Sequence, residues 1–498
     1  MCPEVIDSYE RVKIMRSEGS PFPLYIVLKP EFNPEEEKII KNPTTLIGDY
    51  ERVMDELEKI TTSLEKEEFL HDFLDKKLEE KNVKSDQKEE IILHIMDYLF
   101  LGYGRLGILM RDDRLEEVMI NSARTPLFVF HRKHGMCMTN VEYENDEELN
   151  DFVMWLSKYV GREINEDRPL LDAHMPDGSR ANVAIPPAAP YGPTVTIRKF
   201  KKTPFNVITL IEGDSISTEL AAFLWLCVEG LGLSPSDMLI SGGAGSGKTT
   251  LLNALAMFVP QTERVVTVED TLELNFEFLE NWVPMEARPA VLEGSKLTMH
   301  SLLQNSLRMR PDRVIVGEVR GKEAETLLVA MDIGLHGSMG TIHANNPRET
   351  TIRLMDDPMN VPIRMIPLID LVVVTGRIYD RRRGMIRRII NVSEISGIER
   401  DVVQMGDIYY WDVNTDKIVK TEYPILLKEK ISKNCGITKR RLNAELFIRE
   451  KVLQHMVDNK INSTPDVISM IQRYHMNPKD VIKEIKGKLM EENKLGKK

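Results

Sequence analysis

The spacing of apolar residues changes along the chain and separates it into regions with different predicted structures. In residues 1–101, which are rich in Glu and Lys, apolar side chains recur at helical spacing through 53–60 and 69–74. Prolines at 21, 23 and 30 favour extended or irregular backbone before these helices. We therefore predict that 1–101 forms a helical or irregular adaptor segment whose helices have solvated faces.

Short runs of alternating apolar residues predict a small α+β domain over 102–200. A proline-rich run at 186–193 breaks regular structure and predicts a loop between two strands. The expected elements are strands at 117–121, 127–131, 181–185 and 194–198 and a helix at 147–160. Residues 199–204 are expected to link this domain to the next.

Strand and helix patterns alternate through 205–412, as a mainly parallel sheet covered by helices requires. This region is therefore predicted to be an α/β domain. The expected strands are 238–241, 265–268, 314–316, 340–343 and 371–375. An arginine-rich turn before Gly384, followed by alternation through 385–392, predicts an antiparallel hairpin at the sheet edge.

The last region, 425–498, has a helical pattern. Ser463 and Asn477 are capping residues that are followed closely by a proline and an acidic residue, and each marks a helix start. The apolar residues that recur at helical spacing before them are Leu442, Leu446, Leu453 and Val457. We expect these helices to serve packing or partner contacts rather than chemistry.

Composition narrows the possible functions. With 498 residues, the chain is long enough for roughly three domains, and its formal net charge of -12 argues against a general nucleic-acid-binding protein. The best membrane-span candidate, 220–233, is shorter than the about 20 residues that cross a bilayer, and the amino terminus does not resemble a signal peptide. The four cysteines lack zinc-binding spacing. We expect a cytoplasmic protein with structural thiols.

The most informative motif directly follows the predicted strand at 238–241. It matches the nucleotide-binding pattern GxxxxGK[ST], in which backbone N–H groups and a helix N-terminus converge on phosphate oxygens. Lys248 would reach the β- and γ-phosphates of ATP, and the Thr249 hydroxyl would coordinate Mg²⁺. The expected nucleotide-binding residues are Gly242, Gly243, Ala244, Gly245, Ser246, Gly247, Lys248, Thr249 and Thr250.

Acidic residues follow two of the predicted strands. Glu269 directly follows the predicted strand 265–268, and Glu318 lies two residues after the predicted strand 314–316. Both are therefore expected at the carboxyl edge, where open parallel sheets hold their ligands. One carboxylate can orient an attacking water while the other organises the metal. His343 ends another predicted strand, where its imidazole could sense a γ-phosphate, although a single histidine is more often structural.

Four segments in this order, GGAGSGKTT, VEDTLEL, RPDRVIVGEVRG and GLHGSMGTIHAN, resemble the Walker A, aspartate, Walker B and histidine boxes of the type II/type IV secretion ATPase superfamily. Segments at 117–121, 176–180 and 196–200 are similar to its amino-terminal domain. The resemblance implies a RecA-like ATPase core preceded by a small domain. The sequence lacks the tetracysteine module that bacterial pilus-extension and secretion motors often carry. The run at 356–362 and the amino-terminal domain more closely resemble archaeal members and tight-adherence pilus motors.

The resemblance also implies a role for each candidate residue. Lys248 and Thr249 would contact the phosphates and Mg²⁺, and Glu269 would be the general base. Glu318 would hold the metal and its water, and His343 would sense the phosphate.

Two arginines, Arg180 and Arg198, match family arginines that approach the nucleotide, often from a neighbouring subunit. A planar guanidinium suits charge that spreads over phosphoryl oxygens, while ordinary surface arginines are the alternative interpretation.

As a whole, the resemblance implies a hexameric ATPase at the inner face of the cytoplasmic membrane. It would act on a polytopic membrane platform to power type IV pilus-like filament assembly or protein secretion. An archaellum motor remains an alternative, as does a nucleotide-sensing scaffold, although a sensor would not need Glu269 and Glu318. No nucleic-acid partner is expected, because the chain is acidic and has no stripe of aromatic and basic residues.

Overall fold

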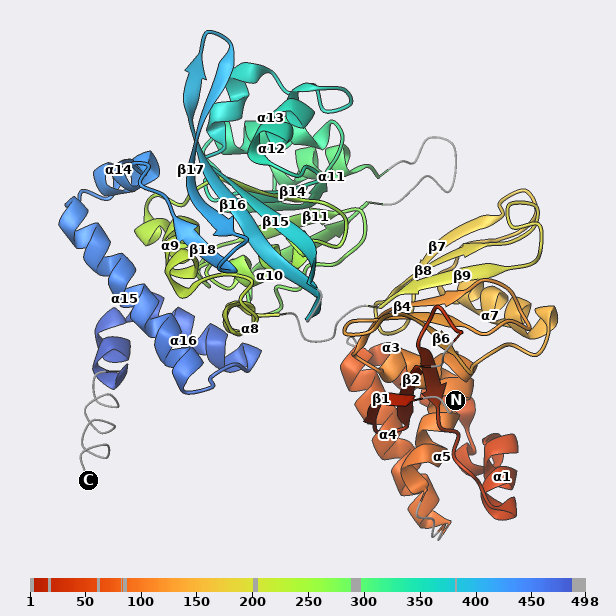
Figure 1. The fold of residues 1–498 in the computed structure, drawn as a ribbon. Coiled ribbons are helices and arrows are strands. Elements are labelled where there is room, and N and C mark those ends of the chain that lie inside the picture. Colours follow the sequence, from red (N-terminus) through yellow and green to blue (C-terminus); the bar gives the residue numbers. More distant parts are fainter. Residues whose placement is uncertain are drawn as a thin grey trace, which may run out of the picture. The chain divides into compact units, whose positions relative to one another are not determined.

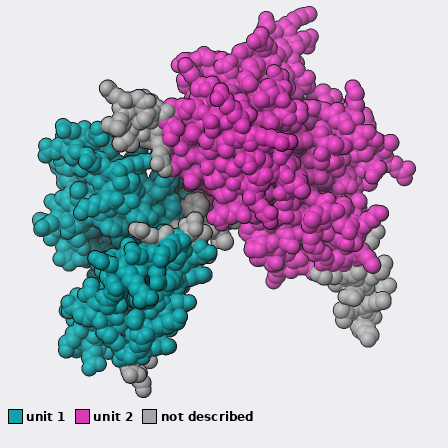
Figure 2. All heavy atoms as spheres, turned by 180° about the vertical axis from the view of Figure 1, so that it is seen from behind, with its two compact units in different colours: residues 1–202 teal, residues 203–498 magenta. Residues whose placement is uncertain are grey.

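The chain forms two compact units, Met1–Lys202 and Thr203–Lys498, each with its own sheet and hydrophobic core (Figures 1 and 2). The computed structural model describes residues 4–16, 19–60, 63–81, 83, 87–199, 205–287, 297–380 and 383–485. The predicted linker at 199–204 coincides with the boundary between the units, and all of it except Lys199 lies outside the described residues.

The first unit contains a nine-stranded sheet with the order β1-β2-β3-β6-β5-β4-β9-β8-β7. Its strands are β1 Glu4–Tyr9, β2 Val12–Arg16, β3 Leu24–Val27, β4 Leu115–Ile120, β5 Phe128–His131, β6 Gly135–Thr139, β7 Leu170–His174, β8 Arg180–Ala184 and β9 Thr194–Arg198. Neighbouring strands are antiparallel except β3 and β6, where Leu24 pairs with Met138 in parallel. The four strands predicted in 102–200 are confirmed as β4, β5, β8 and β9, whereas β6 and β7 were not predicted.

Residues 1–101 do not form a separate adaptor, because their apolar side chains are buried in the core of the first unit. Leu70 and Leu74 of α4 share that core with Val118 of β4, whereas Asp72 and Lys76 on the opposite face of α4 are exposed, so these helices pack through their apolar faces and keep the expected solvated faces. The helices of this unit are α1 Pro34–Lys41, α2 Thr44–Ile47, α3 Tyr50–Lys59, α4 Ser63–Glu80, α5 Lys88–Ile95, η1 Met96–Phe100, η2 Gly104–Leu106, α6 Gly107–Arg111 and α7 Asp146–Tyr159. The α7 helix confirms the prediction at 147–160.

The second unit contains the predicted mainly parallel sheet, with the order β12-β11-β13-β14-β10-β15-β16-β17-β18. The strands are β10 Met238–Gly242, β11 Val265–Glu269, β12 Trp282–Glu286, β13 Arg313–Val319, β14 Met339–Ile342, β15 Leu371–Asp380, β16 Gly384–Glu399, β17 Val402–Asp412 and β18 Lys417–Lys420. The strands from β12 to β15 are parallel, and β16 to β18 continue the sheet in antiparallel pairs. The β15–β16 hairpin is confirmed, but its expected place at the edge is wrong because β17 and β18 extend the sheet.

Helices cover both faces of this sheet, as expected for an α/β fold. Successive side chains of β10 point to opposite faces: Ile240 packs with α9 and α10, whereas Leu239 packs with α11 and α12. The helices are α8 Val207–Glu212, α9 Thr218–Glu229, η3 Gly230–Gly232, α10 Lys248–Ala256, α11 Met299–Ser306, α12 Glu323–Asp332, α13 Pro347–Met355, η4 Ile363–Leu368, α14 Leu426–Asn434, α15 Lys439–Asp458 and α16 Thr464–Met476. The arrangement therefore has three layers, and its core lies on both sides of the central strand.

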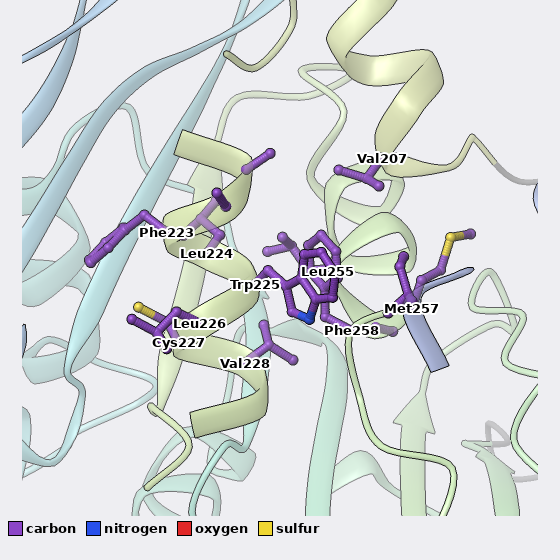
Figure 3. Packing of buried hydrophobic residues seen from close by; sticks show 14 of the residues in the cluster. Val207, Phe223, Leu224, Trp225, Leu226, Cys227, Val228, Leu255, Met257 and Phe258 are labelled. Carbon is purple, nitrogen blue, oxygen red and sulfur yellow. The ribbon is translucent and has the colours of Figure 1, made fainter. Parts of the chain in front are cut away.

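The carboxyl-terminal helices pack into the core of the second unit. Figure 3 shows Trp225 pointing from α9 toward Leu255 and Phe258. The Trp225 ring also lies 5.1 Å from the ring of Tyr474 on α16. Ser463 caps α16 as predicted, and residues 478–485 are helical, while 486–498 lie outside the described residues.

None of the helices in the described ranges combines the length and the apolar character that crossing a bilayer requires.

Candidate active site

The phosphate-binding motif forms the turn between β10 and α10. Gly245 and Gly247 have φ angles of 67° and 92°, a conformation that residues with a Cβ rarely adopt. A Cβ on Gly242 would lie 2.4 Å from the Ser246 hydroxyl oxygen, so this position also requires glycine. Ser246 Oγ lies 2.9 Å from Thr375 Oγ1 of β15, which ties the loop to the neighbouring strand. The loop is therefore held in a defined conformation at the N-terminus of α10.

Lys248 is buried at the centre of this loop. Its Nζ donates hydrogen bonds of 3.1 Å to the carbonyl oxygens of Gly242 and Gly243, and it lies 3.3 Å from His343 Nδ1. An ammonium group has no acceptor, so His343 Nδ1 must accept and the ring proton must be on Nε2. His343 Nε2 lies 2.9 Å from Glu318 Oε1 and can donate to it. Lys248, His343 and Glu318 thus form one continuous chain of side chains.

His343 is neutral in this chain. Burial and the nearby positive charge of Lys248 lower its pKa, and the carboxylate of Glu318 only partly opposes them. A neutral imidazole agrees with the tautomer that the contact to Lys248 requires. His343 follows β14 and Glu318 lies within β13, so two adjacent parallel strands bring these side chains together.

Glu269 ends β11 and is almost completely buried. Its Oε1 accepts hydrogen bonds of 3.0 Å from the backbone N–H groups of Glu273 and Leu274, while its buried Oε2 has no hydrogen-bond partner among the described residues. Burial raises the pKa of Glu269 to about 8, the two backbone hydrogen bonds oppose this rise, and the charge of Glu273 adds to it. A carboxyl group with such a pKa is suited to accept a proton near neutral pH.

Asn253 of α10 is a positioning residue that sequence reasoning did not identify. Its side-chain amide donates to the carbonyl oxygens of Thr249 and Glu273 at 3.2 and 3.3 Å, and its Oδ1 accepts the N–H of Asn275 at 2.9 Å. The segment after Glu269 is thereby attached to the helix that begins at the phosphate loop. No local pattern indicates this role, because the partners belong to different elements.

The second unit places an arginine of its own beside the loop, while the two arginines expected from the sequence belong to the first unit. Arg180 of β8 and Arg198 of β9 are direct cross-strand partners in the first unit, and Arg180 lies 3.5 Å from Asp172. Both arginines therefore lie in a different unit from the phosphate loop. Instead, Arg387 of β16 donates from Nε to the Gly245 carbonyl oxygen at 2.9 Å.

The donor set of this site suits a Mg²⁺-bound nucleotide. Thr249 and Thr250 are in the first turn of α10, where N–H groups and the positive end of the helix dipole favour an anion. Mg²⁺ prefers oxygen ligands, which the Thr249 hydroxyl and the Glu318 carboxylate could supply. Ala244 is exposed at the loop surface.

The sheet order, the loop after β10 and the side chains at the carboxyl ends of β11, β13 and β14 define a RecA-like α/β domain. The chain belongs to the family described as Type II/IV secretion system protein, whose model matches residues 106–492. The family expected from the four sequence boxes is therefore confirmed.

Two relatives come from Methanocaldococcus jannaschii, and both are described as uncharacterized proteins. One is 32% identical over 464 residues, which cover 88% of this chain and 82% of the relative. The other is 48% identical over 248 residues, so the match spans 49% of this chain but 34% of the relative's length. Among solved structures, the VirB11 ATPase from the Brucella suis type IV secretion system, in complex with sulphate, is 25% identical with a TM-score of 0.29, covering 59% of this chain and 96% of that one.

Proposed function

We propose that this chain is an ATP hydrolase that assembles into a homo-oligomeric ring, a hexamer, and works as a motor on a polytopic membrane platform protein. The motor powers type IV pilus-like filament assembly or protein secretion from the cytoplasmic face of the membrane. The observation that carries the proposal is the chain of contacts from Lys248 through His343 to Glu318 at the phosphate loop. Membership of the Type II/IV secretion system family supports the proposal that the chain works in a secretion or pilus-assembly system.

In the proposed reaction, the loop N–H groups and Lys248 bind the phosphates of ATP. Thr249 and Glu318 hold Mg²⁺, which neutralises charge on the phosphates when it is bound. Glu269 accepts the proton of the attacking water through Oε2, which has no hydrogen-bond partner in the described part of the chain. Lys248 exchanges its hydrogen bond to His343 Nδ1 for one with the phosphates, and His343 reports this change of nucleotide state to Glu318 through its Nε2–H.

The ring hypothesis makes a prediction about mixed assemblies. If Arg180 and Arg198 act on the active site of a neighbouring subunit, an arginine variant and Lys248→Ala should complement each other. In a random equal mixture of Arg180→Ala and Lys248→Ala chains, about one quarter of the interfaces would combine an intact loop with an intact arginine. We therefore expect turnover to recover to about a quarter of the wild-type rate, measured as phosphate release.

The matched control mixes Lys248→Ala with Glu269→Gln. Both residues belong to the same second unit, so every site in that mixture lacks one of them and turnover should stay at the level of the separate variants. Absence of recovery in the arginine mixture, with mixed rings confirmed by native mass spectrometry, would contradict the sharing of a site between subunits.

The machine itself can be identified in the host. Loss of this chain should abolish pilus-like filaments or secretion while swimming continues. Loss of swimming with filaments intact would instead support the archaellum alternative. Turnover too slow to sustain either process, with tight ATP binding, would support the nucleotide-sensing scaffold.

A further inference from the structure

An ion pair joins the two chain segments that carry the acidic residues of the site. Arg320 directly follows β13, and its Nη2 pairs with Oδ2 of Asp270, which directly follows Glu269 at the end of β11. The ladder between these strands ends at the pair of Val268 and Val316, so the ion pair lies beyond it. Arg320 and Asp270 are therefore at the carboxyl edge of the sheet, where open parallel sheets hold their ligands.

The backbone of Arg320 is held in place, and its side chain is exposed. The N–H groups of Arg320 and Gly321 donate to Glu323 Oε1 at 2.7 and 2.6 Å, at the start of α12. The Arg320 side chain is 64% exposed and that of Asp270 is 32% exposed. Ion pairs between exposed side chains contribute little to stability, so the guanidinium can leave Asp270 at small cost.

The guanidinium of Arg320 lies within electrostatic reach of His343. Burial and the charge of Lys248 are the larger causes that lower the pKa of His343, and the charge of Arg320 adds to them. Lys248 Nζ lies 3.3 Å from His343 Nδ1, and a lysine at this position of a phosphate loop reaches the β- and γ-phosphates. Arg320 is therefore on the side of the site where the terminal phosphate is expected.

We propose that Arg320 exchanges its ion pair with Asp270 for an ion pair with the γ-phosphoryl group when ATP is bound. A planar, permanently charged guanidinium suits this contact, because negative charge spreads over the γ-phosphoryl oxygens during transfer. Asp270 holds the arginine when no γ-phosphate is present, so its carboxylate competes with the nucleotide. The inference rests on the proposed function and adds to it a residue that distinguishes ATP from ADP.

The test compares the binding of ADP and of AMP-PNP, an ATP analogue that resists hydrolysis, to the full chain in the presence of Mg²⁺. Arg320→Ala should weaken AMP-PNP binding roughly 5- to 50-fold, the scale of a hydrogen bond to a charged group, and leave ADP binding within about twofold. Its ATP turnover, measured as phosphate release, should fall on the order of 10²-fold or more. Retained ADP binding also shows that the variant is folded.

The other partner of the ion pair should respond in the opposite direction. Asp270→Asn removes the competing charge and keeps the size of the side chain, so AMP-PNP should bind as tightly as to wild type or up to about tenfold more tightly. An ion pair that only holds the two segments together predicts a loss of affinity in both variants. Equal losses of AMP-PNP binding in Asp270→Asn and Arg320→Ala would therefore overturn the inference.

Arg353→Ala is the matched control. Arg353 is another exposed arginine whose charge lowers the pKa of His343, but it pairs with Glu349 of its own helix, α13, at 3.1 Å. Its replacement should change AMP-PNP binding by less than about twofold. A loss equal to that of Arg320→Ala would assign the effect to the general charge of the region and overturn the inference, as would unchanged AMP-PNP binding in Arg320→Ala. Wild-type protein that binds neither nucleotide would instead refute the proposed function.

Discussion

Replacing Glu269 with glutamine is expected to lower ATP turnover on the order of 10²-fold or more while ATP affinity stays within a few-fold of wild type. Glutamine keeps the size of the side chain, and its carbonyl oxygen can still accept the N–H groups of Glu273 and Leu274. It cannot accept a proton from water. Phosphate release and an ATP titration on the same preparation measure the two quantities separately.

The pH profile supplies a second readout for Glu269. Because burial raises its pKa to about 8, the ionised fraction of this group grows as the pH rises through that value. Wild-type turnover should therefore rise between about pH 6.5 and 8.5, and the residual activity of Glu269→Gln should lack this rise. Glu273→Gln is the control, and turnover that depends on Glu273 but not on Glu269 would move the role of the base to Glu273.

Trp225→Ala is expected to lower the free energy of unfolding of the second unit by about 3–5 kcal/mol. Trp225 is fully buried, its ring lies 5.2 Å from that of Phe258, and its Nε1 donates to His475 Nε2 at 2.8 Å. The substitution removes a large side chain between α9, α10 and α16, and the surrounding helices can close such a cavity only in part. Urea unfolding followed by far-UV circular dichroism measures the loss.

Two further substitutions separate packing from other effects. Trp225→Phe keeps an aromatic ring and loses the hydrogen bond to His475, so it should cost clearly less than alanine. Phe447→Ala removes an aromatic side chain of α15 that is 58% exposed, and its effect should stay within about 0.5 kcal/mol. A loss below about 1 kcal/mol in Trp225→Ala would mean that the carboxyl-terminal helices do not depend on this core.

The sequence predicted the parts of the fold whose signals are local. The strands β10, β11, β13 and β15 are apolar runs bounded by polar residues, and the phosphate loop carries its glycines at fixed spacing. Ser463 predicts the start of α16 because an N-terminal cap is a hydrogen bond between residues only a few positions apart. Such features depend on neighbours in the chain and can be recognised without the rest of the molecule.

The remaining features depend on partners that are distant in sequence. The pairing of Tyr25 with Thr139 joins β3 to β6. The residue pattern of 1–101 does not indicate which later strand β3 pairs with. The apolar faces of α4 and α15 look the same whether they face solvent, a partner or a core, so the sequence could not decide between these environments. The same holds for the site: Glu269 was predicted as a candidate carboxylate, but its burial follows from the packing of its neighbours. Asp270 and Arg320 come together only because β11 and β13 are neighbours in the sheet.

The central claim is that the loop from Gly242 to Thr249 binds ATP for hydrolysis, and phosphate release by the purified full chain tests it most directly. Wild-type protein should release phosphate from ATP in a reaction that requires Mg²⁺. In Lys248→Ala, which removes the positive charge at the centre of the loop, the rate should fall on the order of 10²-fold or more. Equal rates in folded, oligomeric wild-type and Lys248→Ala proteins, or no Mg²⁺-dependent release by either, would contradict the account.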